Sequence, residues 1–295
     1  MPNFTISSLQ IDDNALYQHY IQAKETFLLH FYNQEKKAHL KGFRKKAERE
    51  ARLRSFPQNH DESFLRARCG IGFEDIDQIF LVATRYRDRF PGIRLGANPT
   101  IEDYLVRWMS SYFTAAANKP RHHNASPKST CSDQAVSTIV RYSQNMTSIQ
   151  VIEAERSHNL FMSAENIQGN LLEEYVANKV RPYGFLWCRG SVLRAVDFCN
   201  TTGELLLQLK NKDNSENSSS SNIREGTDIT KWFRIGTSRQ SGQAIPYYNW
   251  CDLNCLISNH RTQGYTLENC HMSETDYLDF LVEISSANHQ LISSL

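Results

Sequence analysis

The sequence predicts an α+β protein, in which a helical N-terminal region precedes a part that mixes helices with strands. Two observations support this division. Apolar residues recur at helical spacing in the first 120 residues, and after residue 133 the pattern changes to shorter helices interleaved with strand-like runs. A polar stretch with two prolines, residues 118–132, lies between and is best explained as a linker or a long functional loop. We therefore predict a region 1–120 and a domain 121–295.

The N-terminal region is expected to contain three helices. Residues 14–54 show helical spacing of apolar side chains without an interrupting proline. A second helix is expected over 73–90, where a Pro-Gly pair follows. A third should start at 98–100, with the proline inside its first turn.

A strongly basic stretch lies within the first of these helices. Lys36–Arg54 holds nine Lys or Arg residues against Glu48 and Glu50. Such a run is typical of a helix that contacts phosphates, and equally of a solvated helix face. Both interpretations remain open.

The domain after residue 121 is expected to begin with a helix and to continue as strands. Ser163 can cap a helix that runs to about Lys179, and Pro182-Tyr183-Gly184 ends that segment. The expected strands are 185–188, 192–199 and 204–210, with a turn at 200–203 between the last two.

Composition limits the compartment and the general binding properties. The chain has 295 residues, of which 40% are hydrophobic and 22% charged, as in ordinary soluble proteins. A net charge of +1 gives no global attraction to nucleic acid, so any such surface must come from local clustering. With no secretory signal and no membrane-spanning run in the pattern, we expect a cytoplasmic protein without a membrane partner.

Seven cysteines are scattered along the chain and are expected to be reduced in the cytoplasm. One cluster could be interpreted as a zinc site: Cys251, Cys255, His260, Cys270 and His271. Its spacing is loose and has no CxxC pair, so buried thiols are the favoured interpretation.

Asp197 and Lys210 carry the clearest chemical pattern, because they lie on neighbouring strand-like runs that precede a polar loop. A carboxylate can hold Mg²⁺, which neutralises a phosphodiester and lowers the pKa of bound water. A lysine can orient the attacking water or stabilise the pentavalent phosphorus. A tight hairpin would leave Asp197 near the turn and Lys210 beyond the far end, so a bent or offset sheet is needed.

A second carboxylate would come from the preceding helix, where Glu165, Glu173 and Glu174 are candidates. Helical periodicity places Glu165 beside the apolar face, and so favours it as the inward carboxylate. The alternative is that all three are surface residues of an amphipathic helix.

Residues 159–234 resemble the SinI-type type II restriction endonucleases, within the PD-(D/E)XK nuclease superfamily. The similar stretches are Asn159–Tyr175, Ala-Val-Asp-Phe-Cys at 195–199, the polar string that runs on from Leu207-Gln208-Leu209-Lys210, and Lys-Trp-Phe-Arg at 231–234. The resemblance implies a mixed β-sheet flanked by helices, dependence on Mg²⁺ and double-stranded DNA as substrate, with GGWCC as the site that members cut (W is A or T).

The resemblance also implies roles for individual residues. Asp197 would be the metal carboxylate and Lys210 the catalytic lysine. Gln208 occupies the usual acid position, a departure that leaves less charge for the metal. The Gly-x-x-x-Glu pattern that begins at Gly169 points to Glu173, and we prefer it to Glu165 because an active-site face need not be the core face.

DNA reading is expected downstream of the lysine, since Asn and Gln pair with adenine and Arg with guanine. The candidates are Asn214, Asn217, Arg224, Lys231 and Arg234; the alternative is a solvated serine-rich loop. We expect a homodimer, since a nearly palindromic site matches two-fold symmetry, and a cognate DNA methyltransferase as a functional partner. Two rival functions remain: a DNA-binding module without cleavage activity, and a structure-specific repair nuclease of the same fold.

Overall fold

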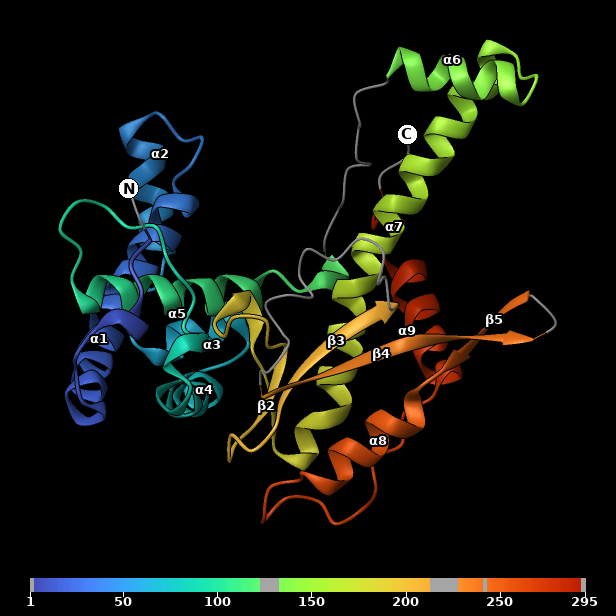
Figure 1. The fold of residues 1–295 in the computed structure, drawn as a ribbon. Helices are drawn as coiled ribbons and strands as arrows, with labels where there is room; N and C mark the ends of the chain where they lie inside the picture. The colour runs from blue at the N-terminus through green and yellow to red at the C-terminus, as the bar shows by residue number, and fades with distance from the viewer. Residues whose placement is uncertain (1–2, 123–132, 213–227, 241–242, 293–295) are drawn as a thin grey trace.

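The computed structural model describes residues 3–122, 133–212, 228–240 and 243–292. It confirms the predicted class: a mixed β-sheet flanked by helices, with a helical N-terminal region (Figure 1). The strands are β1 (Phe185–Trp187), β2 (Phe198–Asn200), β3 (Leu206–Lys212), β4 (Ile229–Gln240) and β5 (Gln243–Tyr248). They lie in the order β1-β2-β3-β4-β5, and β3 pairs with β4 in parallel while the other pairs are antiparallel.

The prediction of a strand over 192–199 was wrong. After β1 the chain forms a short 3₁₀ turn, η5 (Arg189–Ser191), and β2 begins only at Phe198. Ser191 and Ala195 have φ of 57° and 63°, which interrupt extended backbone. The expected strands 185–188 and 204–210 are present as β1 and β3, with slightly shifted ends.

The N-terminal region contains more helices than we expected. They are α1 (Asp13–His39), α2 (Lys46–Arg54), α3 (Glu62–Cys69), α4 (Glu74–Arg85) and α5 (Ile101–Ala117). A continuous helix over 14–54 was wrong, since the chain breaks between α1 and α2 at Gly42, whose φ is 91°. Thr100 caps α5 in a capping box with Asp103, so Pro99 precedes the helix rather than lying in its first turn.

Helix α7 (Ser148–Val180) is much longer than the predicted helix that begins at Ser163. Its N-cap is Thr147, in a capping box with Gln150. The Ser163 hydroxyl instead donates to the carbonyl of Asn159 at 2.8 Å inside the helix. Helix α6 (Gln134–Ser143) packs against the first half of α7, and the two project together from the body of the protein (Figure 1).

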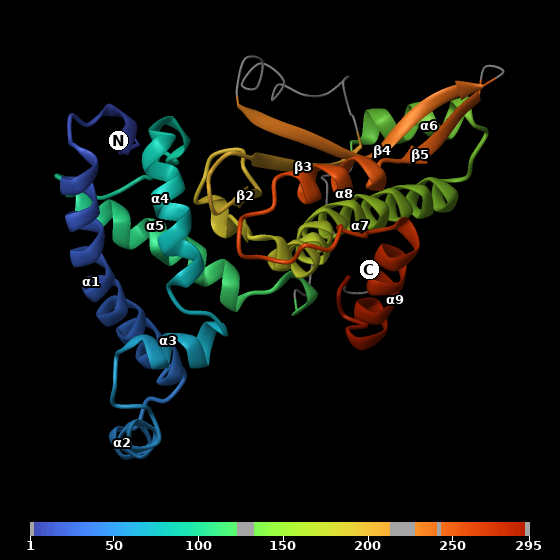
Figure 2. The same ribbon diagram turned by 90° about the horizontal axis from the view of Figure 1, so that it is seen from below.

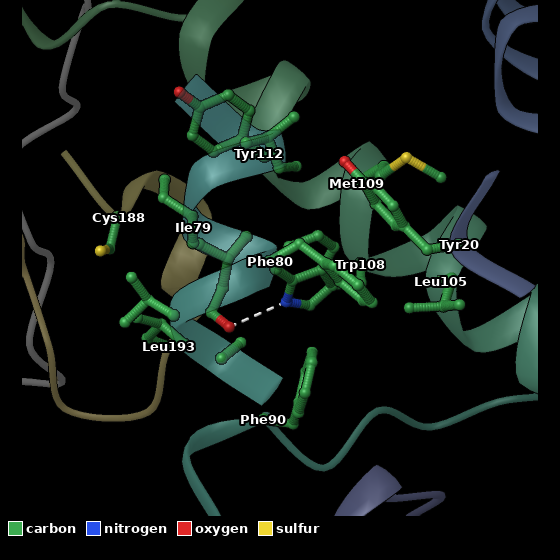
Figure 3. Close-up of a cluster of buried hydrophobic side chains, with 14 of the residues drawn as sticks. Tyr20, Ile79, Phe80, Phe90, Leu105, Trp108, Met109, Tyr112, Cys188 and Leu193 are labelled. Carbon is green, nitrogen blue, oxygen red and sulfur yellow. Dashed lines mark hydrogen bonds between the residues drawn. The ribbon is translucent and has the colours of Figure 1, made fainter. Parts of the chain in front are cut away.

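Two buried clusters hold the sheet in place. Leu207 and Leu209 of β3 pack with α7 and with α8 (Trp250–Asn259) and α9 (Glu274–Ala287). The N-terminal helices share a separate cluster with the region around β1 and β2, and lie beside that end of the sheet (Figure 2). Within it, the indole N–H of Trp108 donates to the carbonyl of Val192 at 2.8 Å (Figure 3). The region 1–120 is therefore packed directly against the strands.

Among the helices of the described residues, none is both long and apolar enough to cross a membrane.

Candidate active site

Hydrogen bonds between β2 and β3 place Asp197 alongside the strand that carries Lys210. The Asp197 N–H donates to the carbonyl of Leu207 at 2.9 Å, and the Leu209 N–H donates to Asp197 Oδ2 at 2.7 Å. Asp197 precedes β2, so it lies opposite the middle of the longer β3 rather than near the turn. This offset removes the geometric objection raised by a tight hairpin.

Glu173 completes a group of charged residues with Asp197 and Lys210. It lies on α7, half-buried, and accepts a hydrogen bond from the indole Nε1 of Trp187 at 3.0 Å. Burial, and next the charge of Asp197, raise the pKa of Glu173 to about 7, while the Trp187 hydrogen bond and the charge of Lys210 oppose the rise. Each of these charges therefore acts on the others through poorly solvated surroundings.

The other two helical candidates lie elsewhere. Glu174 is buried and forms an ion pair with the guanidinium of Arg121, whose backbone N–H also donates to it at 3.1 Å. Glu165 is exposed, and its Oε1 lies 3.7 Å from Lys212 Nζ. Of the three glutamates, the structure brings Glu173 beside Asp197.

Gln208 supplies an oxygen that suits a metal ion. Leu207 and Leu209 point into the core with α7 and α8, so Gln208 and Lys210 share the opposite face of β3. Gln208 is buried, and its Oε1 has no hydrogen-bond partner among the described residues. An unpaired buried amide oxygen is costly unless a ligand completes it. With Glu173 and Asp197 it provides the hard oxygen donors that Mg²⁺ prefers.

The same positions explain why acid-only metal patterns are missing. The described residues hold no group of three or more His, Cys, Asp or Glu arranged for a metal, because an amide stands at the third position here. The zinc alternative is not supported either: Cys251 and Cys255 are exposed on α8, whereas Cys270 is buried, and the group does not converge.

An open pocket of about 470 Å³ lies beside Glu173. It is bounded by α5, α7 and the segment that follows β1. Its lining residues are Arg107, Ser110, Ser111, Thr114, Ala115, Asn118, Pro120, Asn170, Glu173, Trp187, Arg189 and Gly190. Glu173 is therefore accessible from a cavity that both parts of the chain build.

Comparison with known proteins identifies the chain at this point. Residues 100–270 match the family model described as SinI restriction endonuclease. The chain belongs to the SinI restriction endonuclease family. This confirms the resemblance drawn from residues 159–234. The family match begins at Thr100, the N-cap of α5, and so extends beyond the predicted boundary at 120.

Two relatives of this SinI-family chain carry names. It is 43% identical over 152 residues to the type II restriction enzyme Eco47I of Escherichia coli, covering 50% of this chain and 63% of Eco47I. It is 43% identical over 119 residues to the type II restriction enzyme SinI of Salmonella infantis, covering 39% of this chain and 52% of that enzyme. The matches thus span less than two thirds of either relative.

The predicted DNA-reading residues of this SinI-family chain are in different situations. Asn214, Asn217 and Arg224 lie outside the described residues. Lys231 is half-buried on β4. Arg234 is buried, forms an ion pair with Glu274, and its Nε donates to Asn211 Oδ1 at 2.9 Å. These contacts favour a structural role for Arg234.

Sequence patterns missed Trp187 and the polar side of α5. Trp187 binds the carboxylate of Glu173, fourteen residues earlier, and α5 reaches the pocket from the N-terminal region. No local spacing links these segments, because the packing of α5 on the chain after β1 brings them together. The tight contact at Gly190 was the available signal, and it is visible only in three dimensions.

Proposed function

We propose that this protein is a type II restriction endonuclease that hydrolyses phosphodiester bonds in double-stranded DNA at a short specific site. The observation that carries the proposal is the meeting of Glu173, Asp197 and Lys210 in a SinI-family chain. Both named relatives are type II restriction enzymes, which supports the same activity here.

In this proposal Asp197, Glu173 and the amide oxygen of Gln208 hold Mg²⁺, as in a PD-(D/E)XK site whose third acid is replaced. A bound Mg²⁺ would neutralise the phosphate and lower the pKa of a water molecule. Lys210 orients that water or stabilises charge on the phosphorus. Because Gln208 brings no charge, the site depends more heavily on Glu173.

We propose a GGWCC-like recognition site, read by Asn214, Asn217, Arg224 and Lys231 through amide and cationic contacts to base edges. Arg234 would support these residues from its buried ion pair. A cognate methyltransferase would protect the same site in the host, as a functional rather than a physical partner.

The basic stretch Lys36–Arg54 is proposed to contact DNA phosphates. It has a net charge of +7, whereas the whole chain is +1, so the remaining residues together carry −6. Helix α2 has no buried residue, and its two ion pairs, from Lys45 and Lys46, join exposed groups at 4.0 and 3.9 Å. Such charges remain available to a polyanion.

The protein is proposed to act as a homodimer, since a nearly palindromic DNA site matches a two-fold protein. Exposed apolar side chains gather on the projecting α6–α7 pair, which we name the α6–α7 surface. Its members are Val136, Ile139, Tyr142, Ile149, Ile152, Leu160, Phe161 and Met162. A cluster of this kind is typical of a protein interface.

Digestion of plasmid DNA tests the function. The purified protein is incubated with plasmid and Mg²⁺, and the ends of the products are sequenced. Discrete fragments with a shared end sequence are expected. Binding without cutting would instead identify a DNA-binding module, which the replacement of an acid by Gln208 keeps in view. Cutting without a shared sequence would identify a structure-specific nuclease.

A further inference from the structure

The pocket beside Glu173 is lined mainly by hydrogen-bond donors. Arg107 and the hydroxyls of Ser110, Ser111 and Thr114 come from α5, and Arg189 comes from η5. Glu173 is the one acid in the lining. Guanidinium and hydroxyl groups are the usual partners of DNA phosphates, whereas base edges also require acceptors.

Arg189 is held without a partner for its charge. Its guanidinium lies 4.3 Å above the ring of Trp187, and its Nε is buried without a hydrogen-bond partner. Within the described residues, no carboxylate oxygen lies within 4.0 Å of it. A half-buried cation that lacks a counter-ion is costly, and an anion in the pocket would remove that cost.

Trp187 fixes Arg189 relative to the candidate active site. The same indole that stacks under the guanidinium donates its N–H to Glu173 at 3.0 Å. An anion bound by Arg189 would therefore lie next to the metal-binding carboxylate, at the distance of a neighbouring group rather than in its place.

Helix α5 is fixed against the same segment. A side chain at Gly190 would place its Cβ 2.3 Å from the carbonyl oxygen of Ser111, so the two backbones are in direct contact. Trp108 bonds to Val192, and Figure 3 shows it in one buried cluster with Tyr112 and Leu193. The polar side of α5 is thus rigidly positioned toward the pocket.

We propose that Arg189 and Arg107 bind a backbone phosphate of the DNA next to the phosphate that is cut. The inference rests on the proposed nuclease function and adds a subsite to it. Arg107 is exposed at the pocket rim and Arg189 lies inside, so the two approach an anion from opposite walls. The N-terminal region would then complete the cleavage site through α5.

Binding measurements with Arg189→Gln test the subsite. The probe is a 30-bp duplex containing GGACC, with Ca²⁺ in place of Mg²⁺ to slow hydrolysis. Loss of one charged contact should weaken binding about tenfold and reduce the salt slope by about one. Arg107→Gln should act in the same direction, and Arg189→Lys should restore part of the affinity because it keeps the charge.

Arg156→Gln is the matched control. Arg156 is exposed on α7, about 25 Å along the helix from Glu173. This variant should bind like the wild type. Thermal unfolding of each variant separates lost affinity from lost folding, and the exposed Arg107 provides a second test should Arg189→Gln fold poorly.

Neutral phosphates locate the contact. A series of duplexes, each with one methylphosphonate linkage, is bound by wild type and by Arg189→Gln. The wild type should lose about tenfold in affinity at a linkage adjacent to the cut, and Arg189→Gln should lose nothing further there. Equal losses in both proteins at every linkage would overturn the inference.

The outcomes separate this inference from the proposed function. Unchanged binding by Arg189→Gln and Arg107→Gln, with a wild type that cuts DNA, overturns the subsite alone. Weaker binding by the variants with a wild type that never cuts supports the subsite and overturns the nuclease. A wild type that binds no duplex overturns both.

Discussion

At the scale of single residues, Asp197 and Lys210 are expected to be essential for cleavage but not for binding. Asp197→Ala removes a metal ligand and Lys210→Ala removes the cation beside it, while the donors proposed to contact DNA remain. Each variant should abolish cutting of plasmid, with duplex affinity retained in a mobility-shift assay. Mg²⁺-dependent cutting by either variant would contradict the site.

Glu173 and Glu165 provide a matched pair on the same helix. Glu173→Gln should reduce the cleavage rate by about 10²-fold or more, since it removes charge from the metal site. Glu165→Gln should cut like the wild type, because its partner is the exposed Lys212. Single-turnover rates on a plasmid measure both, and the reverse order would favour the helical-wheel interpretation.

The titration of Glu173 should lower stability as pH rises in metal-free protein. Burial and the charge of Asp197 raise the pKa of Glu173 to about 7, above its value in the unfolded chain. The folded state then holds a proton that the unfolded state has lost, so stability falls between about pH 4.5 and 7, by on the order of 2 kcal/mol.

Urea unfolding in EDTA at pH 5 and pH 8 measures this effect. Glu173→Gln keeps the neutral form at both values, so it should be more stable than the wild type at pH 8 and similar to it at pH 5. A difference that does not change with pH would refute the assignment.

At the scale of elements, the contact between η5 and α5 determines how the site is built. Gly190 has φ of 65°, and its Cβ position meets the backbone of Ser111. Gly190→Ala should therefore destabilise the protein by about 2 kcal/mol or more and separate α5 from the site. Urea unfolding gives the loss.

Gly169→Ala is the control for that change. Gly169 lies inside α7, and no described atom outside the local helix backbone is within 4 Å of its Cβ position. Alanine is the better helix former, so this variant should gain about 0.5–1 kcal/mol. A similar loss in both variants would show that the η5 contact has no special importance.

At the scale of the whole molecule, the α6–α7 surface should control assembly. Ile149→Glu places a charge among exposed apolar side chains and should convert a dimer to a monomer, measured by light scattering after gel filtration. Gln144→Glu, at the exposed C-cap of α6, should leave the dimer intact. A dimer that survives Ile149→Glu would place the interface elsewhere.

Much of the fold could be predicted from local patterns. The end of α7 at Pro182-Tyr183-Gly184 and the positions of β1 and β3 follow from turn residues and apolar runs. The errors occurred where φ becomes positive, at Gly42 and Ala195, since several turn conformations suit the same residues. The true start of α7 was hidden because Ser163 is tolerated inside a helix.

The sequence by itself determined the fold class, the family and the candidate pair Asp197 and Lys210, because these depend on residue type and short spacing. Only the tertiary structure decided that Glu173 joins that pair while Glu174 is bound to Arg121. It also decided that α5 forms a wall of the pocket beside Glu173. The physical reason is that long-range packing sets which side chains share one poorly solvated volume, and a linear pattern carries no such distances.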